Sequence, residues 1–395
     1  MVQITYIIKL SIIIFFIYIG NLKSISAQEN DLDTQNDTAF PENDSSATSL
    51  EEYNQPITLS GLLRNDSTYA RFDKNTIQRD YFSNLLEARL ILERKRIDWN
   101  FYTDMRLYRF EGGDKMGIQK AQYDKNQAKL MRAFLRYFSS IGDFTIGKLY
   151  INAGNSGIFN PFELDKSFQF SDLQYAREGF SGIEYSLPWN LNNFNLFTAT
   201  GKNFKYEPVA GYNPIYGTSL QLHFLTIDAG MAMIHTDRNN NRSGLFFKGD
   251  MILGVQGSYA AHIDDKIKFQ YSEANAGIDY SFYSGKITTT LLYYYNEKGA
   301  RNKINYQMSA ESFLKARDYI LLSGVYQIDE FWNIQLPVFI NIVDQSTAVI
   351  PSLTTLLSGG LSVNVQLPFF TGKTSDEFSN TRNSFTLLLR VEGKF

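Results

Sequence analysis

Residue types that support catalysis or metal binding are sparse in this sequence. Its 395 residues include three histidines, His223, His235 and His262, and no cysteine. A hydrolytic site needs a serine, a histidine and an acid or amide on one assembled patch. The sequence leaves open that His223 or His235 finds such partners, but no motif requires it. No His, Asp and Glu spacing resembles a set of metal ligands either. We therefore expect no catalytic residue, no metal and no cofactor.

A glycine-rich stretch, "GKLYINAGNSGIFNP" at residues 147–161, raises a second chemistry. A strand followed by a glycine-rich loop also begins a phosphate-binding site, but that site requires a helix directly after the glycines. Here Pro161 and the preceding Asn160 oppose a helix, and no Lys-Ser or Lys-Thr pair follows. The stretch instead predicts the end of a strand that runs into a long loop, with Asn160 and Pro161 fixing the turn.

A third group consists of charged residues that recur at even spacings within each of three runs. They share one face of a period-two pattern, whose other face is apolar. The group comprises Glu87, Arg89, Asp98, Asp104, Arg106, Arg132 and Arg136.

The elements that position these charges are predicted to be long strands. From residue 97 the sequence reads "IDWNFYTDMRLYRF", in which apolar and polar residues alternate for about twelve positions. Successive side chains of a strand point to opposite faces, so one face is apolar and the other charged. Comparable runs occupy 86–93, 251–259, 273–282 and 331–342. A globular strand has about five or six residues, whereas a tilted membrane-spanning strand needs about 9–11.

The connections between these runs are of two kinds. Tight turns are predicted at 140–143 and 283–286, and long polar loops at 111–127, 201–214, 237–244 and 370–382. Alternation of short turns with long loops is typical of an outer-membrane β-barrel. We therefore predict an all-β fold, a transmembrane antiparallel barrel of about 16 strands (14–18). A secreted soluble β-sandwich or propeller is the alternative, but the small residues of the polar faces favour a barrel lumen.

Both termini support export to a membrane. Residues 1–27 contain an apolar stretch preceded by Lys9 and followed by small residues, which predicts a cleaved signal peptide. Residues 28–55 carry eight acidic and no basic residues, and so predict a disordered acidic periplasmic segment before the barrel at 56–395.

The barrel keeps 36 of the 38 basic and 33 of the 41 acidic residues. This near-balance gives no case for nucleic-acid binding.

Aromatic residues make up 15% of the chain, which fits belts at the membrane boundary. The run 291–297 and Tyr271, Tyr280 and Phe282 are predicted belt residues, although Tyr294 is also a candidate for stacking on a sugar in the lumen. The last strand, "SFTLLLRVEGKF", ends on Phe395. It resembles the C-terminal signal by which bacterial outer-membrane proteins are recognised by the barrel-assembly machinery, except that Gly393 stands where an aromatic is common.

The segment from 146 to about 188 resembles a family of porin-like outer-membrane barrels of Gram-negative bacteria. The matching residues are Gly147, Lys148, Gly154, Phe159, Asn160 and Pro161. The sequence departs from the family at Leu149, where Gln is usual, at Ala153, where Trp is usual, and at Glu163, where Asp is usual. The resemblance covers about 40 residues. It implies an outer-membrane channel-like protein and identifies no substrate.

We therefore expect a porin-like channel for passive diffusion of small hydrophilic solutes, with outer-membrane lipid around it and no enzymatic activity. In a water-filled barrel, opposed acidic and basic side chains build a transverse field that sorts solutes by charge and dipole. The mixed signs argue against strong specificity for anions or cations. Alternatively, these charges are ion pairs in a plugged interior.

The loop with Glu163, Asp165 and Asp172 is expected to fold inward opposite Arg132 and Arg136. A closed barrel that acts as an adhesin or belongs to a secretion or assembly complex remains open, and an outer-membrane hydrolase is a more remote alternative. The oligomeric state does not follow from the sequence.

Overall fold

The structure, a computed structural model, describes residues 56–395 except 75–76, 113–125, 152, 155–158, 164–177, 203–211, 237–240, 251, 265, 307–313, 374 and 379–384. The predicted signal peptide (1–27) and acidic segment (28–55) lie outside the described residues. Among the described residues, no helix is long and apolar enough to cross a membrane.

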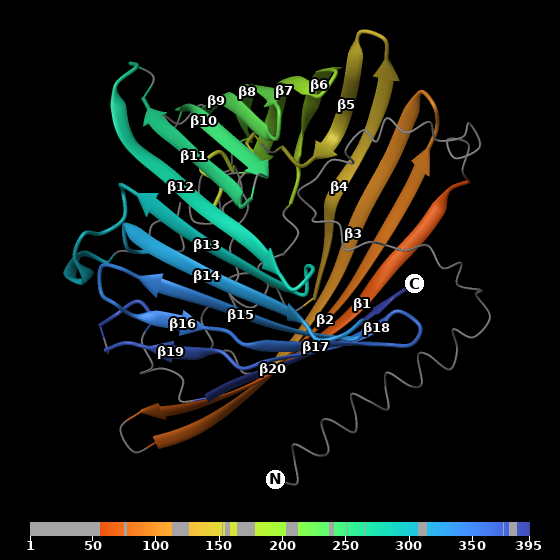
Figure 1. The fold of residues 1–395 in the computed structure, drawn as a ribbon. Helices are drawn as coiled ribbons and strands as arrows, with labels where there is room; N and C mark the ends of the chain where they lie inside the picture. The colour runs from red at the N-terminus through yellow and green to blue at the C-terminus, as the bar shows by residue number, and fades with distance from the viewer. Residues whose placement is uncertain are drawn as a thin grey trace. The chain divides into compact units, whose positions relative to one another are not determined.

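The described chain consists almost entirely of strands (Figure 1), with one 3₁₀ turn, η2 (Lys303–Asn305). The strands are β1 (Thr58–Lys74), β2 (Ile77–Lys95), β3 (Trp99–Gly112), β4 (Asn126–Ser139), β5 (Gly142–Leu149), β6 (Phe180–Trp189), β7 (Asn192–Lys202), β8 (Tyr212–Phe224), β9 (Ile227–Thr236), β10 (Asn241–Asp250), β11 (Gly254–Ile263), β12 (Phe269–Phe282), β13 (Ile287–Asn296), β14 (Asp318–Gln327), β15 (Trp332–Asn341), β16 (Thr347–Val349), β17 (Ser352–Leu357), β18 (Leu361–Gln366), β19 (Phe369–Thr371) and β20 (Phe385–Lys394).

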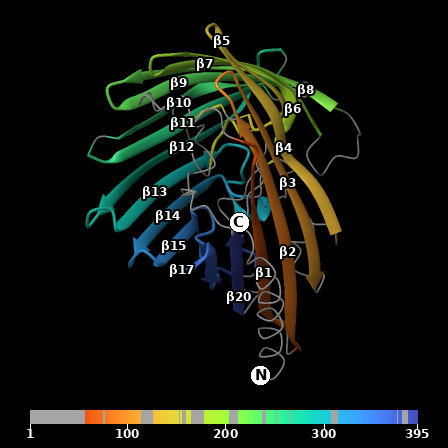
Figure 2. The ribbon, with the colours of Figure 1, turned by 90° about the vertical axis from the view of Figure 1, so that its right-hand side faces the viewer.

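These strands form one closed antiparallel barrel. Each strand from β1 to β15 pairs with the next along the chain, and β20 pairs with β1 from Leu62↔Lys394 to Arg71↔Phe385. Figure 2 shows the sheet curling from β1–β4 past β5–β9 to β13–β20. Closure leaves no free edge, so the backbone groups of all neighbouring strands are paired within the sheet.

The barrel has 18 strands, which corrects the predicted value of about 16. β16 and β17 both pair with β15 and form one interrupted strand; β18 and β19, paired with β17 and β16, form another. Pro351 lies at the first interruption and Pro368 at the second. Proline has no N–H to donate to the ladder, so the strand pairing is broken at these positions. These short pieces make the period-two pattern hard to recognise in the sequence.

The two ends of the barrel differ as predicted. At one end, called the turn end, the strands are joined by short connections such as Ser140–Ile141 and Tyr283–Lys286. Tyr283, Ser284 and Gly285 all have positive φ, which suits a tight hairpin. At the other end, called the loop end, the connections between β5 and β6 and between β13 and β14 are far longer.

The alternating faces also follow the predicted pattern. Large apolar side chains such as Leu196, Met233 and Leu245 point outward and are 53%, 57% and 61% exposed. Rows of exposed apolar residues around a closed barrel indicate a lipid-facing surface. Two expectations are corrected. The alternating run begins at Trp99, because Ile97 and Asp98 belong to the β2–β3 turn. Tyr271 is 6% exposed and stacks inside the barrel on His262, so it is not a belt residue.

Gly147 is an inward-facing residue near the end of β5, two positions before the last inward residue, Leu149. Its φ is +133°, and a Cβ added there would lie 2.3 Å from the carbonyl oxygen of Ala133 on β4. Only glycine tolerates both the backbone conformation and the close approach.

We therefore expect Gly147→Val to lower the free energy of unfolding of the barrel by about 1–3 kcal/mol or more. The measurement is a urea titration in which unboiled gels separate folded from unfolded protein, and the variant should unfold at a lower urea concentration than the wild type. Gly324→Val is the matched control, because nothing lies within 4 Å of a Cβ at Gly324. Equal midpoints for the two variants would contradict this role of Gly147.

Candidate functional site

The candidate site is the charged inner wall formed by β20 and β1–β4, which we call the basic wall. Residues directly opposite each other in an antiparallel pair point to the same side, so the register places Asn364, Arg390, Asp66 and Leu85 in one inward row. Buried Arg64, Asp66, Glu87, Asp104 and Arg106 confirm this inward face. In a pleated strand every second residue is inward, which is why charges spaced by two gather here.

The centre of the basic wall is a buried carboxylate between two arginines. Asp66 accepts hydrogen bonds from Arg64, at 2.7 Å from Nη2, and from Arg390, at 2.9 Å from Nε. Arg390 comes from the last strand and Arg64 and Asp66 from the first, so this cluster lies across the closure of the barrel. Such charge-assisted, two-pronged contacts fix geometry as well as charge.

Four of the predicted pore-lining residues form ion pairs next to this cluster. Arg106 Nη1 lies 3.2 Å from Glu87 Oε1, and Arg89 Nε donates to Asp104 Oδ1 at 3.1 Å. Each pair joins β2 to β3. These contacts are the cross-strand ion pairs that the sequence left open as an alternative.

Arg132 and Arg136 are held differently. A bulge between β3 and β4, where Asp104 pairs with Arg132 and Met105 with Leu130, leaves Met131 as the extra residue. The Arg132 guanidinium lies 5.4 Å from the Tyr150 ring, and its Nε has no hydrogen-bond partner among the described residues. Arg136 donates to Thr145 at 3.1 Å. Asp98, the seventh predicted residue, is exposed in the β2–β3 turn, outside this inward surface.

The strand ends of the basic wall add further charges. Over the described inward positions of β20 and β1–β4 there are nine basic and five acidic residues. The basic ones are Arg64, Arg89, Lys95, Arg106, Lys129, Arg132, Arg136, Arg390 and Lys394, and the acidic ones are Asp66, Glu87, Glu93, Asp104 and Glu392. The excess is four positive charges.

The rest of the interior has the opposite balance. The described inward positions of β5–β13 carry six acidic and two basic residues: Asp143, Glu184, Asp228, Asp250, Glu273 and Asp279 against Arg242 and Lys248. The interior charge is therefore divided between two sides of the barrel, basic on β20 and β1–β4 and acidic on β5–β13.

The chain after β5 folds into the barrel. We call residues 150–163 the inward segment, of which 150, 151, 153, 154 and 159–163 are described. Ile151, Ala153 and Phe162 are buried against inward-facing residues of β7–β11, including Phe197 and Phe246. Farther along, Phe159 stacks on Tyr294 of β13 at 4.7 Å and meets Phe339 of β15 edge to face. The segment thus reaches from β5 to the opposite side of the barrel.

Three side chains fix the backbone of the inward segment. Arg242 Nη1, 6% exposed as a residue, donates to the carbonyl oxygens of Glu163 at 2.6 Å and Pro161 at 3.3 Å. Asn275 donates to the carbonyl oxygen of Phe159. Asn160 Oδ1 accepts from the Phe162 N–H at 2.9 Å, the turn expected at Asn160 and Pro161. These bonds satisfy carbonyls that would otherwise be buried without partners.

Glu163 is 2% exposed and accepts a hydrogen bond from the Tyr150 hydroxyl at 2.8 Å. Because Arg132 lies over the Tyr150 ring, Tyr150 connects the carboxylate to the basic wall. Arg136 donates a hydrogen bond to Thr145 of β5. Asp165 and Asp172 lie outside the described residues.

Glu178, just before β6, is bonded to Lys129 and Lys148. Burial raises the pKa of this carboxyl, but the hydrogen bonds and charges of the two lysines outweigh burial and hold the pKa below its usual value. Glu178 is therefore ionised at neutral pH and neutralises part of the positive charge where β4 meets β5.

A second polar network fixes the loop end of β14–β16. Glu377 accepts from Asn341 Nδ2 at 2.8 Å and from the Lys315 N–H at 2.9 Å, and its own N–H donates to Asp344 at 2.7 Å. Burial raises the pKa of Glu377 above its usual range, although hydrogen bonds from Tyr319 and Lys315 act in the opposite direction. The network attaches the β13–β14 and β19–β20 connections to the strands below them.

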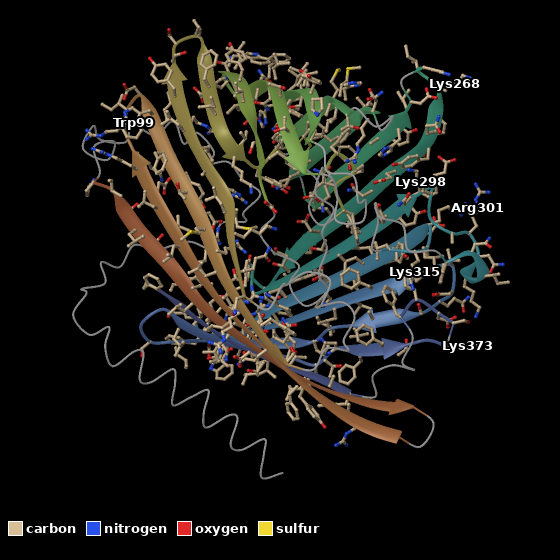
Figure 3. All side chains as sticks on the ribbon, turned by 180° about the vertical axis from the view of Figure 1, so that it is seen from behind. Trp99, Lys268, Lys298, Arg301, Lys315 and Lys373 are labelled. Atoms are coloured by element: carbon tan, nitrogen blue, oxygen red, sulfur yellow. The ribbon has the colours of Figure 1, made fainter. Side chains whose placement is uncertain are left out.

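Basic residues also lie along this loop end. Figure 3 shows Lys268, Lys298, Arg301, Lys315 and Lys373 there, with Trp99 at the opposite end of the barrel. Lys303, in η2, pairs with Asp376 at 3.0 Å.

The histidines do not form a catalytic group. The only hydrogen bond of the His223 ring among the described residues is with Asp228, at 2.7 Å, near the turn end. His235 stacks on Tyr216 on the outward face, and His262 is buried 3.5 Å from Glu273. Among the described residues there is no group of three or more His, Cys, Asp or Glu that could hold a metal ion.

Several site residues carry no sufficient signal in the sequence. Arg64 and Asp66 have the right spacing of two, but β1 lacks an apolar alternate face, so the strand itself is not obvious. Arg390 is on the polar face predicted for the last strand, yet nothing local links it to Asp66, 324 residues away. Arg242 becomes important only through its contact with the inward segment.

We expect Asp66→Asn to lower the free energy of unfolding by about 3–5 kcal/mol, because it leaves two arginines in the wall without their shared carboxylate. Glu111→Gln, which breaks the exposed Arg109–Glu111 pair, is the control and should cost at most about 1 kcal/mol. Urea unfolding in detergent micelles, followed by tyrosine and tryptophan fluorescence, measures both. Equal losses in the two variants would contradict the structural role of Asp66.

We expect Arg242→Met to release the inward segment, because two carbonyls lose their donor. Limited proteolysis of the folded barrel should then cut within 150–163, whereas Lys248→Met, on the same inward row of β10, should leave the segment protected. Resistance of both variants would show that apolar packing alone holds the segment.

No protein-family model matches the sequence, and no curated protein matches it. Among solved structures, the fold is similar to a BenF-like porin from Pseudomonas fluorescens Pf-5, with a TM-score of 0.60, 9% identity, and coverage of 87% of this chain and 99% of that one. It is also similar to OccAB4 of Acinetobacter baumannii, with a TM-score of 0.58, 12% identity and coverage of 87% and 98%. OccK5 (OpdH) of Pseudomonas aeruginosa gives a TM-score of 0.56, 9% identity and coverage of 85% and 98%. At these identities the likeness concerns the fold, a porin-type barrel.

Proposed function

We propose that this chain forms an outer-membrane channel through which small hydrophilic solutes diffuse passively. The observation that carries the proposal is the division of interior charge, basic on β20 and β1–β4 and acidic on β5–β13. A barrel that served only as a scaffold would gain nothing from separating its charges in this way. The porin-type fold of the structural neighbours supports the same conclusion.

The charge division favours solutes that carry a dipole. Across a narrow interior, opposed positive and negative walls create a field that aligns a zwitterion and retains a solvated ion less. Over the described inward positions of both walls, eleven basic and eleven acidic residues balance, so the charge count favours neither anions nor cations. The channel is therefore proposed to accept polar and zwitterionic solutes, with electrostatics and the inward segment setting the passage.

The basic loop-end residues extend this field outward. Lys268, Lys298, Arg301 and Lys373 are exposed, and an exposed cluster of one sign raises the local concentration of solutes with an opposite charge. They would lead the acidic group of a zwitterion toward the entrance. Nearby acids such as Asp264 and Asp376 limit the strength of this effect.

The proposal includes the route to the membrane. The signal peptide at 1–27 directs export, the acidic segment at 28–55 remains in the periplasm, and the strand ending at Phe395 is recognised by the barrel-assembly machinery. The exposed apolar rows around the barrel then face outer-membrane lipid. We propose no enzymatic activity, because the described histidines share no site.

One observation favours the alternative of a closed barrel. The inward segment packs against apolar side chains on both sides of the interior, Phe162 with Phe246 and Phe159 with Tyr294. Such packing fills part of the lumen. A closed barrel of this kind would serve as a surface adhesin or as part of a secretion or assembly complex.

Proteoliposome swelling separates the two functions. With a small zwitterionic amino acid outside, liposomes that contain the folded protein should swell faster than protein-free liposomes, whereas a trisaccharide should give a smaller difference. Swelling at the protein-free rate with both solutes would rule out the channel and leave the closed barrel.

We expect the double variant Arg132→Gln, Arg136→Gln to lower the anion-to-cation permeability ratio. A unit charge about 6 Å from a solute in water contributes about 0.7 kcal/mol, or about threefold for each arginine. Arg94→Gln is the matched control, because Arg94 lies on the outward face against Trp99. An unchanged ratio in the double variant would remove the basic wall from the passage.

A further inference from the structure

The interior has a third side, which carries no charge. On β14–β19, all of whose residues are described, no inward residue is Asp, Glu, Lys or Arg. Amides and hydroxyls stand there in two neighbouring rows that the strand register joins. One row is Gln327, Asn333, Thr354 and Asn364, and the other is Gln335, Ser352 and Gln366. We call the residues of these two rows the amide wall.

The amide wall borders the part of the interior that water reaches. Toward the loop end of β14 and β15 the inward residues are buried, with Leu321 2% and Phe339 0% exposed. Toward the turn end of the same strands, the inward Gln327 and Gln335 are exposed. Lys248, inward near the turn end of β10, is exposed as well. The interior is therefore packed near the loop end, around the inward segment, and accessible from the turn end.

The exposed amides of this wall are available to a solute. The side chains of Gln327 and Gln335 form no hydrogen bond with any described residue. Other residues of the wall are held in place, because Asn364 Nδ2 donates to Thr354 at 2.7 Å. Gln327 lies opposite Asn333, and Gln335 is two residues farther along β15. Such diagonal neighbours are about 7–8 Å apart, a span that one hexose bridges between two long side chains.

The chemistry of the wall suits an uncharged solute rich in hydroxyls. A glutamine amide has one acceptor oxygen and two donor hydrogens, and a sugar hydroxyl is also both donor and acceptor, so one amide bonds two adjacent hydroxyls. The basic wall offers less to such a solute, because Asp66, Glu87 and Asp104 are bound by its arginines. Tyr294, the candidate for stacking on a sugar, is 5% exposed and covered by Phe159.

We propose that the amide wall binds uncharged polyhydroxy solutes, simple sugars, at the turn end of the interior, with Gln327 and Gln335 in contact with the sugar. This role rests on the proposed channel function and adds a class of solute that is recognised by hydrogen bonds and not by charge. Zwitterions are aligned between the charged walls, whereas sugars follow the neutral side that lies between β13 and β20. A few net hydrogen bonds give a dissociation constant of about 1 mM or weaker, which allows rapid release.

Saturation-transfer NMR on the folded wild-type protein tests this role without requiring conduction. The probe is glucose, and the micelles are of lauryldimethylamine oxide, a detergent without a sugar. Glucose should receive saturation from the protein beyond that seen with micelles alone. Gln335→Leu should raise the glucose dissociation constant about two- to tenfold, the effect of one net hydrogen bond. Gln256→Leu, on the inward face of β11 opposite Lys248, is the matched control and should leave the constant unchanged.

A second variant tests the other exposed amide. Gln327→Leu should weaken glucose binding by a similar factor, because Gln327 is placed on the same solute from the neighbouring strand. Heat-modifiable migration on gels verifies that each variant is folded. Wild-type protein that transfers no saturation to glucose would overturn the proposal. So would glucose binding that is unchanged in both Gln327→Leu and Gln335→Leu, or that is weakened equally in the Gln256→Leu control.

Liposome swelling distinguishes failure of this role from failure of the channel. If the barrel is closed, swelling stays at the protein-free rate with every solute, yet glucose still reaches the amide wall from the turn end and the NMR result supports binding. If the barrel conducts a zwitterionic amino acid but glucose does not bind, the channel stands and the sugar site is rejected.

Discussion

The pairing of the first strand with the last is the contact on which the rest of this structure depends. In a hydrocarbon environment every backbone N–H and C=O must find a partner, and an open sheet would leave two unpaired edges. β1 and β20 remove those edges by pairing from Leu62↔Lys394 to Arg71↔Phe385. Asp66, bound by Arg64 of its own strand and Arg390 of the partner strand, lies on the inner side of this closure.

Closure also gives each residue a side. Once the sheet is a barrel, the pleat sends alternate residues to lipid or to the interior, and at the depth of the hydrocarbon a charged residue is favoured on the inside. Charges on β20 and β1–β4 therefore converge on one wall, and those of β5–β13 on the facing one. The inward segment crosses between them, and its main chain is held by Arg242 and Asn275. The proposed passage is thus a product of strand order as much as of residue type.

The faces of most strands were predictable from the sequence because the period of two is a property of every strand. The inward position of Glu87, Arg89, Asp104 and Arg106 follows directly from this alternation. The turn at Asn160 was predictable as well, since an asparagine side chain bonds to the backbone two residues on.

Register and distant contacts were not predictable. Nothing in the sequence near Asp98 shows that the chain turns before β3. Tyr271 differs from a belt tyrosine only through its contact with His262 on the neighbouring strand β11. β1 has polar residues on both faces, so the alternation fails there. Interruptions at Pro351 and Pro368 obscure two further strands. The partners of Asp66 and of the inward segment depend on contacts between residues far apart in the chain.

The central claim is that the interior of this barrel is a passage. Single-channel recording in planar lipid bilayers tests it most directly, with the refolded wild-type protein whose heat-modifiable migration verifies the barrel. The account predicts discrete, ohmic current steps in potassium chloride, with a reversal potential close to zero across a salt gradient, because the basic and acidic residues of the interior balance. Folded protein that inserts into the bilayer and yields no unitary current would contradict it.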